Sequence, residues 1–240
     1  MHIPFLHPAS MPYRRFLVVG DIHGMSVRFM DLMERVRFDP KEDFLVLLGD
    51  YIDRGDGALI VLEQVRRYVE GGSCVALRGK HEQMLLDYFR NGDTAWLNNG
   101  GSGTLSRMLE RPKEKQDAIL SFCASLPLSY RAVLPSPRIF RYLGRTQGYF
   151  FTHGGVDPTR SLNAQEPKVL LASRPELFDG IYKGPDTLVV GHTPTMFLGD
   201  IRFLPLWRGH VLYMDTASYF PEGRISCVDL LTGDIFHSQG

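Results

Sequence analysis

Short apolar runs alternate with stretches of helical periodicity in the first half of the chain. Residues 16–19, 44–48 and 74–77 are apolar runs, and a glycine follows each run closely. Residues 26–36, 58–68 and 82–89 carry apolar side chains at near-helical spacing, as with Val27, Met30, Leu32 and Met33 in the first of these segments. Strand, loop and helix in succession are typical of parallel βαβ units, so the pattern predicts a parallel sheet with helices packed on it.

The second half has a different pattern. Residues 91–103 are rich in Gly and Asn, and residues 112–124 have the pattern of a further helix. Apolar runs then follow at 139–143, 149–152, 188–190, 211–214 and 225–230. Closely spaced runs with turns between them predict a second, more antiparallel sheet. The fold class is therefore α/β, a sandwich of two mixed β-sheets packed face to face with helices outside.

The length and the absence of a linker composition predict one domain. At 240 residues and 44% hydrophobic content, the chain can bury a single sizeable core. We expect the domain to span residues 13–240, preceded by a short, partly ordered lead-in at residues 1–12.

Acidic and histidine-containing turns follow the predicted strands. The sequences are GDIHG at 20–24, GDYIDRG at 49–55, GKHE at 79–82, HGG at 153–155 and GHT at 191–193. Each motif alone has an ordinary explanation, such as a capped helix start or a hydrogen-bonded histidine. As a set, however, they place polar side chains at the carboxyl ends of several strands, where α/β sheets bind ligands. Mixed carboxylate and imidazole ligands suit Mn, Fe or Zn.

Composition narrows the partners. The 27 basic and 27 acidic residues cancel, so the overall charge gives no reason to expect nucleic acid or an anionic membrane as a partner. Three widely spaced cysteines form no CxxC pair and make a disulfide framework unlikely, which favours a cytoplasmic location. No apolar run is long enough to span a bilayer. We expect a monomer.

The motifs together resemble the phosphoprotein phosphatase family, with its signatures GDxHG, GDxxDRG, GNHE, H and GH. The resemblance extends over residues 13–227 and is greatest to the small bacterial and bacteriophage lambda type; the stretches at 81–87 and 98–101 add to it. It implies the calcineurin-like metallophosphoesterase architecture. The sequence GHTP at 191–194 stands where related nucleases and phosphodiesterases have GHxH, so the phosphatase branch is favoured.

The resemblance also implies roles for individual residues. Two divalent ions, Mn²⁺ before Fe or Zn, would be bound by Asp21, His23, Asp50, His153 and His192, with Asp50 bridging both. His81 would be the general acid, oriented by Asp53. Arg54 and Arg174 would bind the phosphoryl oxygens. The implied reaction is direct attack on phosphorus by a metal-bound hydroxide, without a covalent enzyme intermediate.

Lys80 departs from the family pattern, which has a metal-binding asparagine at this position. An ammonium group has no lone pair, and about 4 Å from a dication it would be repelled by ~8 kcal/mol at an effective dielectric of ~20. Lys80 could swing away, ligate as a neutral amine, replace the second ion as a tethered cation, become carbamylated, or point into solvent without effect. We expect weaker binding of the second metal and reduced turnover.

Three functions follow from these features. The first is a metal-dependent phosphomonoesterase acting on phosphoserine or phosphothreonine in proteins, and also on phosphotyrosine or small phosphoesters. The second is a symmetrical bis(5'-nucleosyl)-tetraphosphatase, which would need platforms for two nucleosides; Tyr51, Trp96 and Trp207 are the candidates. The third, suggested by Lys80, is a phosphoryl-binding module without catalysis.

Overall fold

The computed structural model describes residues 5–6, 13–134, 148–174, 182 and 184–239. The strand predicted at 139–143 lies outside the described residues. The division into a lead-in and a domain stays a prediction, although residues 5 and 6 form a short strand, β1 (Phe5–Leu6), that pairs with a strand of the main body.

One sheet has five strands in the order β11-β10-β2-β3-β4. The strands are β2 (Arg15–Val19), β3 (Asp43–Leu47), β4 (Cys74–Ala76), β10 (Ser226–Asp229) and β11 (Ile235–His237). As predicted, β2, β3 and β4 run parallel, with Phe16 opposite Phe44. Strand β10 pairs antiparallel with both β2 and β11, so this sheet is mixed.

The other sheet has six strands in the order β1-β5-β6-β7-β9-β8. Besides β1, they are β5 (Ser129–Ala132), β6 (Gly148–Thr152), β7 (Asp186–Val190), β8 (Leu206–Arg208) and β9 (Val211–Tyr213). The prediction of a more antiparallel second sheet is wrong, because β6–β7 and β7–β9 pair in parallel. Parallel neighbours need a long crossover, and the described part of the segment between β6 and β7 includes helix α7 (Pro167–Ala172).

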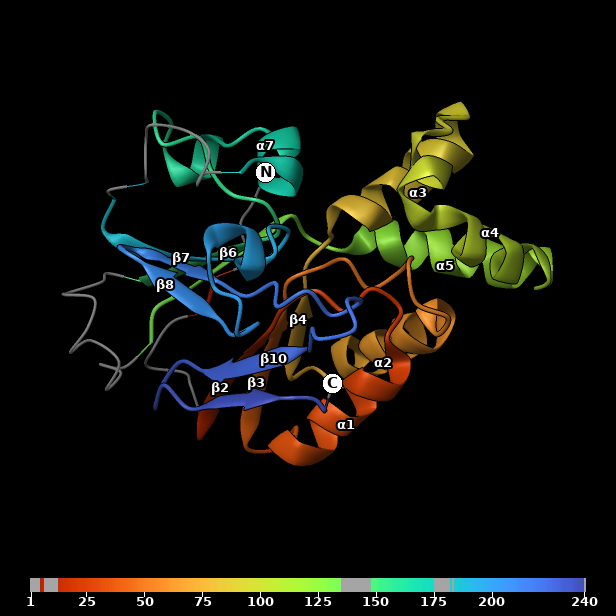
Figure 1. Cartoon of the computed structure of the whole chain (residues 1–240). Coiled ribbons are helices and arrows are strands. Elements are labelled where there is room, and N and C mark those ends of the chain that lie inside the picture. The colour runs from red at the N-terminus through yellow and green to blue at the C-terminus, as the bar shows by residue number, and fades with distance from the viewer. Residues whose placement is uncertain (1–4, 7–12, 135–147, 175–181, 183, 240) are drawn as a thin grey trace.

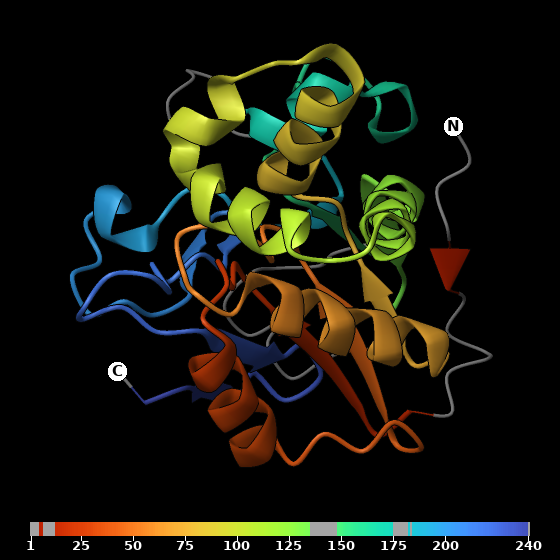
Figure 2. The same cartoon turned by 90° about the vertical axis from the view of Figure 1, so that its right-hand side faces the viewer.

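Helices cover the outside of this sandwich (Figures 1 and 2). Helices α1 (Ser26–Val36) and α2 (Ala58–Glu70) lie along the five-stranded sheet, and α7 lies over the six-stranded one. Helices α3 (Lys80–Asn91), α4 (Ser102–Leu109) and α5 (Lys113–Ser125) form a group beside α2. Short helical turns, η2 (Leu97–Gly101), η3 (Leu162–Ala164) and η5 (Thr195–Leu198), complete the described helices.

The two-residue period of the strands divides the core into layers. Phe16 and Val18 of β2 face the six-stranded sheet, whereas Leu17 and Val19 face α1 and α2. The layer between the sheets also contains Phe44, Val46, Tyr130, Tyr149, Phe151, Val189, Leu212 and Met214. Strands buried on both faces must be apolar at every position, which explains why β2 and β3 appear in the sequence as continuous apolar runs.

Part of the apolar periodicity predicted for α1 lies at the surface. In α1 the buried face consists of Phe29, Leu32, Met33 and Val36, while Val27 and Met30, also counted in the predicted periodicity, are mostly exposed.

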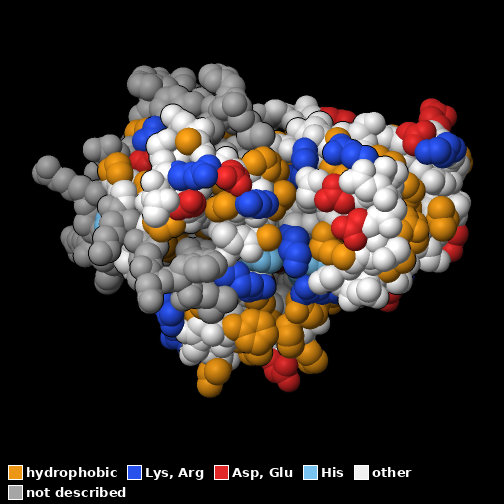
Figure 3. Space-filling view, turned by 90° about the horizontal axis from the view of Figure 1, so that it is seen from above, with side chains coloured by type: hydrophobic (Ala, Val, Ile, Leu, Met, Phe, Trp, Pro, Cys, Tyr) orange, Lys and Arg blue, Asp and Glu red, His pale blue; other side chains and the backbone are white. Residues whose placement is uncertain are grey.

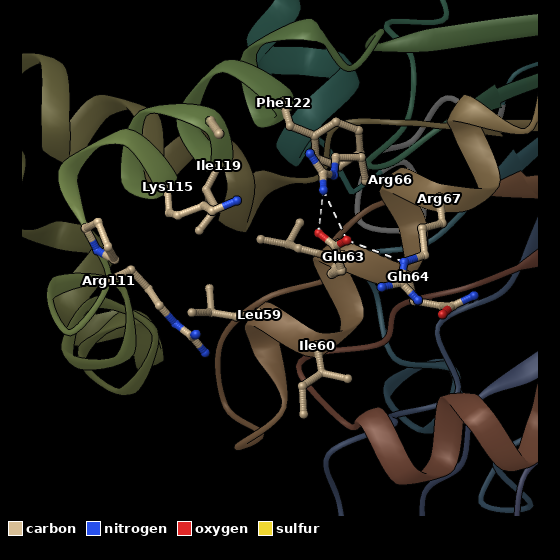
Figure 4. A pocket seen from close by; sticks show the side chains of 13 residues that line it. Leu59, Ile60, Glu63, Gln64, Arg66, Arg67, Arg111, Lys115, Ile119 and Phe122 are labelled. Carbon is tan, nitrogen blue, oxygen red and sulfur yellow. Dashed lines mark hydrogen bonds and ion pairs between the residues drawn. The ribbon is translucent and has the colours of Figure 1, made fainter.

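A groove of about 620 Å³ runs between α2 and α5, lined by apolar and basic side chains such as Leu59, Ile119 and Arg111 (Figure 4). Among the described residues, no helix is long and apolar enough to cross a membrane.

Candidate metal centre

The predicted site residues lie in loops whose backbone is constrained. His23, Asp50, Asp53, Arg54 and His192 all have positive φ, between 49° and 70°. Side chains other than glycine adopt this left-handed conformation at a cost, and such residues gather at functional sites. The loops also pack closely: Gly49 has φ 107°, and a Cβ there would lie 2.6 Å from the Gly79 backbone. The loops after β3 and β4 can therefore meet only because both positions are glycine.

Asp50 lies at the centre of the cluster. Its Oδ2 atom is 3.7 Å from His23 Nε2, 3.3 Å from His153 Nε2 and 3.9 Å from His81 Nε2. Two groups of buried side chains could hold an ion, and both contain this carboxylate: His23, Asp50 and His81, and Asp50, His153 and His192. A carboxylate shared by two ligand sets is the arrangement that a pair of bridged ions needs.

Two of the histidines present the correct nitrogen to this centre. His23 Nδ1 lies 3.2 Å from the Ile52 carbonyl oxygen, and His153 Nδ1 lies 3.0 Å from that of Leu48. Because a carbonyl only accepts, Nδ1 must carry the proton, which leaves the Nε2 lone pair free for a metal. His153 Nε2 is fully buried and makes no hydrogen bond with a described residue, so a cation would satisfy an otherwise orphaned atom.

Asp21 approaches from the edge of the cluster. Its Oδ1 and Oδ2 atoms accept hydrogen bonds from the His192 backbone N–H at 3.1 and 3.2 Å, and Oδ2 lies 3.9 Å from His23 Nε2. Burial and the neighbouring Asp215 carboxylate raise the pKa of Asp21 well above its usual value. This crowding of buried carboxylates is a destabilising arrangement that divalent cations would relieve.

The pKa values of the histidines differ because their charged neighbours differ. Burial lowers the pKa of His153, but the Asp50 and Asp21 carboxylates outweigh burial and raise it to about 9. Burial, followed by the charges of His153, Arg174 and Lys80, lowers the pKa of His192 to about 3. Burial likewise lowers the pKa of His23. Binding of a metal at His153 must therefore displace a proton.

His81 has a second set of contacts that distinguishes it from the other histidines. Its Nδ1 lies 2.7 Å from Asp53 Oδ2, and the same oxygen accepts a hydrogen bond from Trp96 Nε1 at 2.7 Å. Thr104 Oγ1 donates to Asp53 Oδ1 at 2.6 Å. All three partners are buried around Asp53, so the imidazole is fixed with Nε2 facing the cluster.

Basic side chains surround the buried histidines at the surface (Figure 3). Arg54 Nη2 lies 3.3 Å from His81 Nε2, and Arg174 Nη1 donates to Thr193 Oγ1 at 2.9 Å. Lys80 begins α3 and is partly exposed. Within the part of the chain that the structure describes, its ammonium makes no hydrogen bond or ion pair, yet its charge acts on His192.

Glu82, the last residue of the GKHE motif, has a structural role beside the site. Its buried carboxylate accepts backbone hydrogen bonds from Gly79 and Asp50 at 2.9 Å and from Tyr51 at 2.8 Å. Burial and the Asp50 charge raise the pKa of Glu82 to about 7. Glu82 thus ties the loop after β3 to the start of α3, which no local sequence signal indicates.

The proposed nucleoside platforms are only partly available. Tyr51 and Trp96 are both completely buried, and Tyr51 Oη donates to the Leu77 carbonyl at 2.7 Å. Neither can stack on a base, so both candidates are core residues, as aromatic side chains most often are. Trp207 is partly buried against the layer between the sheets. Tyr219, which was not predicted, lies with its ring centroid 4.0 Å from Arg54 Cζ.

Comparison with known proteins agrees with this geometry. The family model for calcineurin-like phosphoesterases matches residues 14–215, which include every candidate ligand. This chain is a calcineurin-like phosphoesterase. The phosphoesterase is 32% identical over 215 residues to serine/threonine-protein phosphatase 1 of Salmonella typhimurium, covering 87% of this chain and 88% of that protein.

Other relatives of this phosphoesterase have a different named activity. A symmetrical bis(5'-nucleosyl)-tetraphosphatase of Aromatoleum aromaticum is 28% identical over 166 residues, covering 67% of this chain and 53% of that protein. A crystal structure described as that of a candidate diadenosine tetraphosphatase superposes with a TM-score of 0.68 over 100% of this chain and 99% of the other, at 20% identity. At that identity the likeness confirms the fold, two mixed sheets with helices outside.

The residues present fit the two divalent ions that such phosphoesterases bind. The shared Asp50 carboxylate, the free Nε2 atoms of His23 and His153 and the crowded acidic groups are the donor set of a dinuclear centre. The set contains oxygen and nitrogen donors only, because Cys74, Cys123 and Cys227 are buried elsewhere as free thiols.

Proposed function

We propose that this chain is a dinuclear-metal phosphomonoesterase that hydrolyses phosphoserine and phosphothreonine residues in proteins. The observation that carries the proposal is the pair His81 and Asp53 placed beside the candidate metal ligands: an imidazole held by a buried carboxylate, with its other nitrogen facing the site. The likeness to a serine/threonine-protein phosphatase over most of both chains supports the choice of substrate.

Each residue has a role in this proposal. Asp21, His23, Asp50, His153 and His192 would hold two Mn²⁺ ions, which would supply positive charge to the phosphoryl oxygens and make the attacking water more acidic. Arg54 and Arg174 would bind the remaining phosphoryl oxygens through charge-assisted hydrogen bonds. His81 would donate a proton to the departing alkoxide, which is the step that phosphoserine and phosphothreonine require.

Lys80 would make the second metal position weaker than the first. It stands at the start of α3, and its charge acts on His192, a candidate ligand of that ion. Turnover would then depend on high metal concentration. If the lysine instead replaces the second ion, the protein binds phosphoryl groups with almost no turnover. A cytoplasmic location stays a prediction from cysteine usage.

A symmetrical dinucleoside tetraphosphatase is the second candidate, because relatives with that name match two thirds or more of this chain. The burial of Tyr51 and Trp96 argues against it, whereas the partly exposed Tyr219 packs against Arg54 and could contact a base.

One comparison separates the two candidates. At saturating Mn²⁺, kcat/KM is measured for a phosphothreonine peptide and for diadenosine tetraphosphate, with His81→Asn as the inactive control. The proposal predicts release of inorganic phosphate from the peptide at the higher kcat/KM. Faster formation of ADP from the dinucleotide would overturn it in favour of the second candidate.

A further inference from the structure

The loop that follows β9 crosses the candidate metal centre in a conformation that needs support. Ala217 has φ 58°, which is unfavourable for a residue with a Cβ. Its backbone N–H donates to Asp215 Oδ1 at 2.9 Å. Gly223 closes the loop so tightly that a Cβ there would meet the Ala217 carbonyl oxygen. Strain of this kind persists only where surrounding contacts hold the segment in place.

Arg28 of α1 supplies those contacts from the other end of the sequence. Its Nη1 donates to the carbonyl oxygens of Ser218 at 2.5 Å and Phe220 at 2.9 Å, and its Nη2 donates to that of Pro221 at 3.1 Å. No described carboxylate forms an ion pair with Arg28. The guanidinium therefore binds three carbonyl groups of one loop, which its rigid fork of donors holds in place.

The residue enclosed by these bonds is Tyr219. Its ring lies 4.0 Å from Arg54 Cζ in a cation–π arrangement and meets the His23 ring edge-on at 5.2 Å. Arg54 itself is exposed and follows a positive-φ residue in its loop. Apart from the 3.3 Å approach to His81, no described side chain makes a hydrogen bond or ion pair with its guanidinium. The Tyr219 ring is thus the main restraint on where Arg54 points.

We propose that Arg28 is a positioning residue for phosphoryl binding: it holds the loop at 218–221 so that Tyr219 keeps Arg54 aimed at the site. The inference rests on the proposed role of Arg54 as a phosphoryl ligand. A long exposed arginine loses rotamer entropy when it binds an anion, and fixing it beforehand reduces that loss. Arg28 acts on substrate affinity through two intermediate residues, and its own hydrogen bonds go to loop carbonyls and to none of the candidate metal ligands.

The test is a double-mutant cycle of Arg28→Met with Tyr219→Leu. The readouts are kcat/KM for p-nitrophenyl phosphate and the affinity for inorganic phosphate, measured by calorimetry on the Mn²⁺-loaded protein. In the parent background, Arg28→Met is expected to lower kcat/KM and the affinity for phosphate by about tenfold each. The fall in kcat/KM should come mainly from a higher KM. In the Tyr219→Leu background the same change is expected to have no further effect, because the link to Arg54 is already gone.

Controls distinguish positioning from folding. Arg35→Met, on the same helix but paired with Asp31 at 2.8 Å, should change neither readout. Arg28→Lys keeps the positive charge without the fork of donors, so its kcat/KM and phosphate affinity should lie between those of the parent and of Arg28→Met. It also replaces Arg28→Met in the cycle if that variant does not fold. Equal losses in both backgrounds, or no loss in the parent, would overturn the inference. If the parent hydrolyses no phosphate ester, the proposed function fails, and the phosphate affinities alone still test the role of Arg28.

Discussion

His81 Nδ1 lies 2.7 Å from Asp53 Oδ2, and this contact fixes the direction of the imidazole at the candidate metal centre. Asp53 is itself held by Trp96 and Thr104, so the carboxylate has one orientation available. His81 Nε2 consequently faces Asp50 at 3.9 Å and Arg54 at 3.3 Å. A proton donor held in this way could serve an alkoxide that departs on the side of the phosphoryl group facing His81.

Replacing Asp53 should therefore impair catalysis in a manner that depends on the leaving group. Asp53→Asn removes the charge and turns an amide donor toward the Trp96 or His81 donors. We expect kcat for a phosphothreonine peptide to fall by about 10²–10⁴-fold, with a much smaller fall for p-nitrophenyl phosphate, whose leaving group needs little protonation. Trp96→Phe, which removes one donor and keeps an aromatic ring, is the milder comparison. Equal losses on both substrates would contradict general-acid catalysis by His81.

Lys80 should limit the affinity of the second metal position. Lys80→Asn replaces an ammonium that acts on His192 with a neutral oxygen donor. We expect the Mn²⁺ concentration for half-maximal turnover to fall by about tenfold or more, as for other residues that complete a coordination sphere. Lys41→Asn, on the exposed turn before β3, is the matched control and should not shift the titration. Identical Mn²⁺ titrations for the parent and Lys80→Asn would mean that Lys80 lies outside the coordination sphere.

Glu82 should contribute strongly to the stability of the fold. Its carboxylate accepts buried backbone N–H groups from Gly79, Asp50 and Tyr51. Glu82→Gln offers a single acceptor and adds two donors, so it should reduce the free energy of unfolding by about 2–4 kcal/mol. Urea unfolding at neutral pH measures this, with the surface change Glu63→Gln as the control, expected to stay within about 0.5 kcal/mol. A similar loss for both variants would refute the structural role of Glu82.

Acid should remove the stabilisation that the ion pair of Arg15 and Asp43 gives to the five-stranded sheet. Arg15 Nε and Nη2 donate to Asp43 at 2.8 and 2.6 Å, and Asp43 is completely buried. Burial raises the pKa of Asp43, but the Arg15 hydrogen bonds and the Asp39 backbone N–H outweigh it and lower the pKa below its usual value. A depressed pKa stabilises the fold above the unfolded value of about 3.9, and the effect is lost as pH falls through the folded pKa.

Asp43→Asn should accordingly lower the urea midpoint at pH 7, by an amount equivalent to about 2–3 kcal/mol, and the difference from the parent should narrow below about pH 4. Glu42→Gln, which breaks an exposed pair with Arg14, is the control at both pH values. A difference that stays constant with pH would show that the Asp43 carboxylate is not the titrating group.

The sequence predicts the part of the fold that short-range patterns encode. Apart from the Arg15–Asp43 pair at their start, strands β2, β3 and β4 are apolar because both faces are buried, and the glycine turns mark where each strand ends. By contrast, β5 contains Ser129 and Arg131, and β8 is only partly buried, so neither has a local signal. Their stability comes from neighbours in the sheet, and from long-range pairs such as Arg131 with Asp186.

The same distinction applies to the site. The candidate ligands are found from the sequence because each stands beside a glycine in a turn, at a fixed spacing. The residues that hold them in place carry no such mark: Thr104 bonds to Asp53 across 51 positions, and Arg28 bonds to the Ser218 carbonyl across 190. The roles of Arg54 and Arg174 stay predictions, although both side chains lie beside the cluster.

The most direct test of the central claim, a dinuclear metal centre around Asp50, is a metal titration of the metal-free protein. Hydrolysis of p-nitrophenyl phosphate is measured after chelation and again during addition of Mn²⁺, for the parent and for Asp50→Asn, with Asp31→Asn as a surface control. The account predicts no turnover after chelation, recovery of the parent and of Asp31→Asn with Mn²⁺, and no recovery of Asp50→Asn at any Mn²⁺ concentration. Turnover that survives chelation, or that is unchanged by Asp50→Asn, would contradict it.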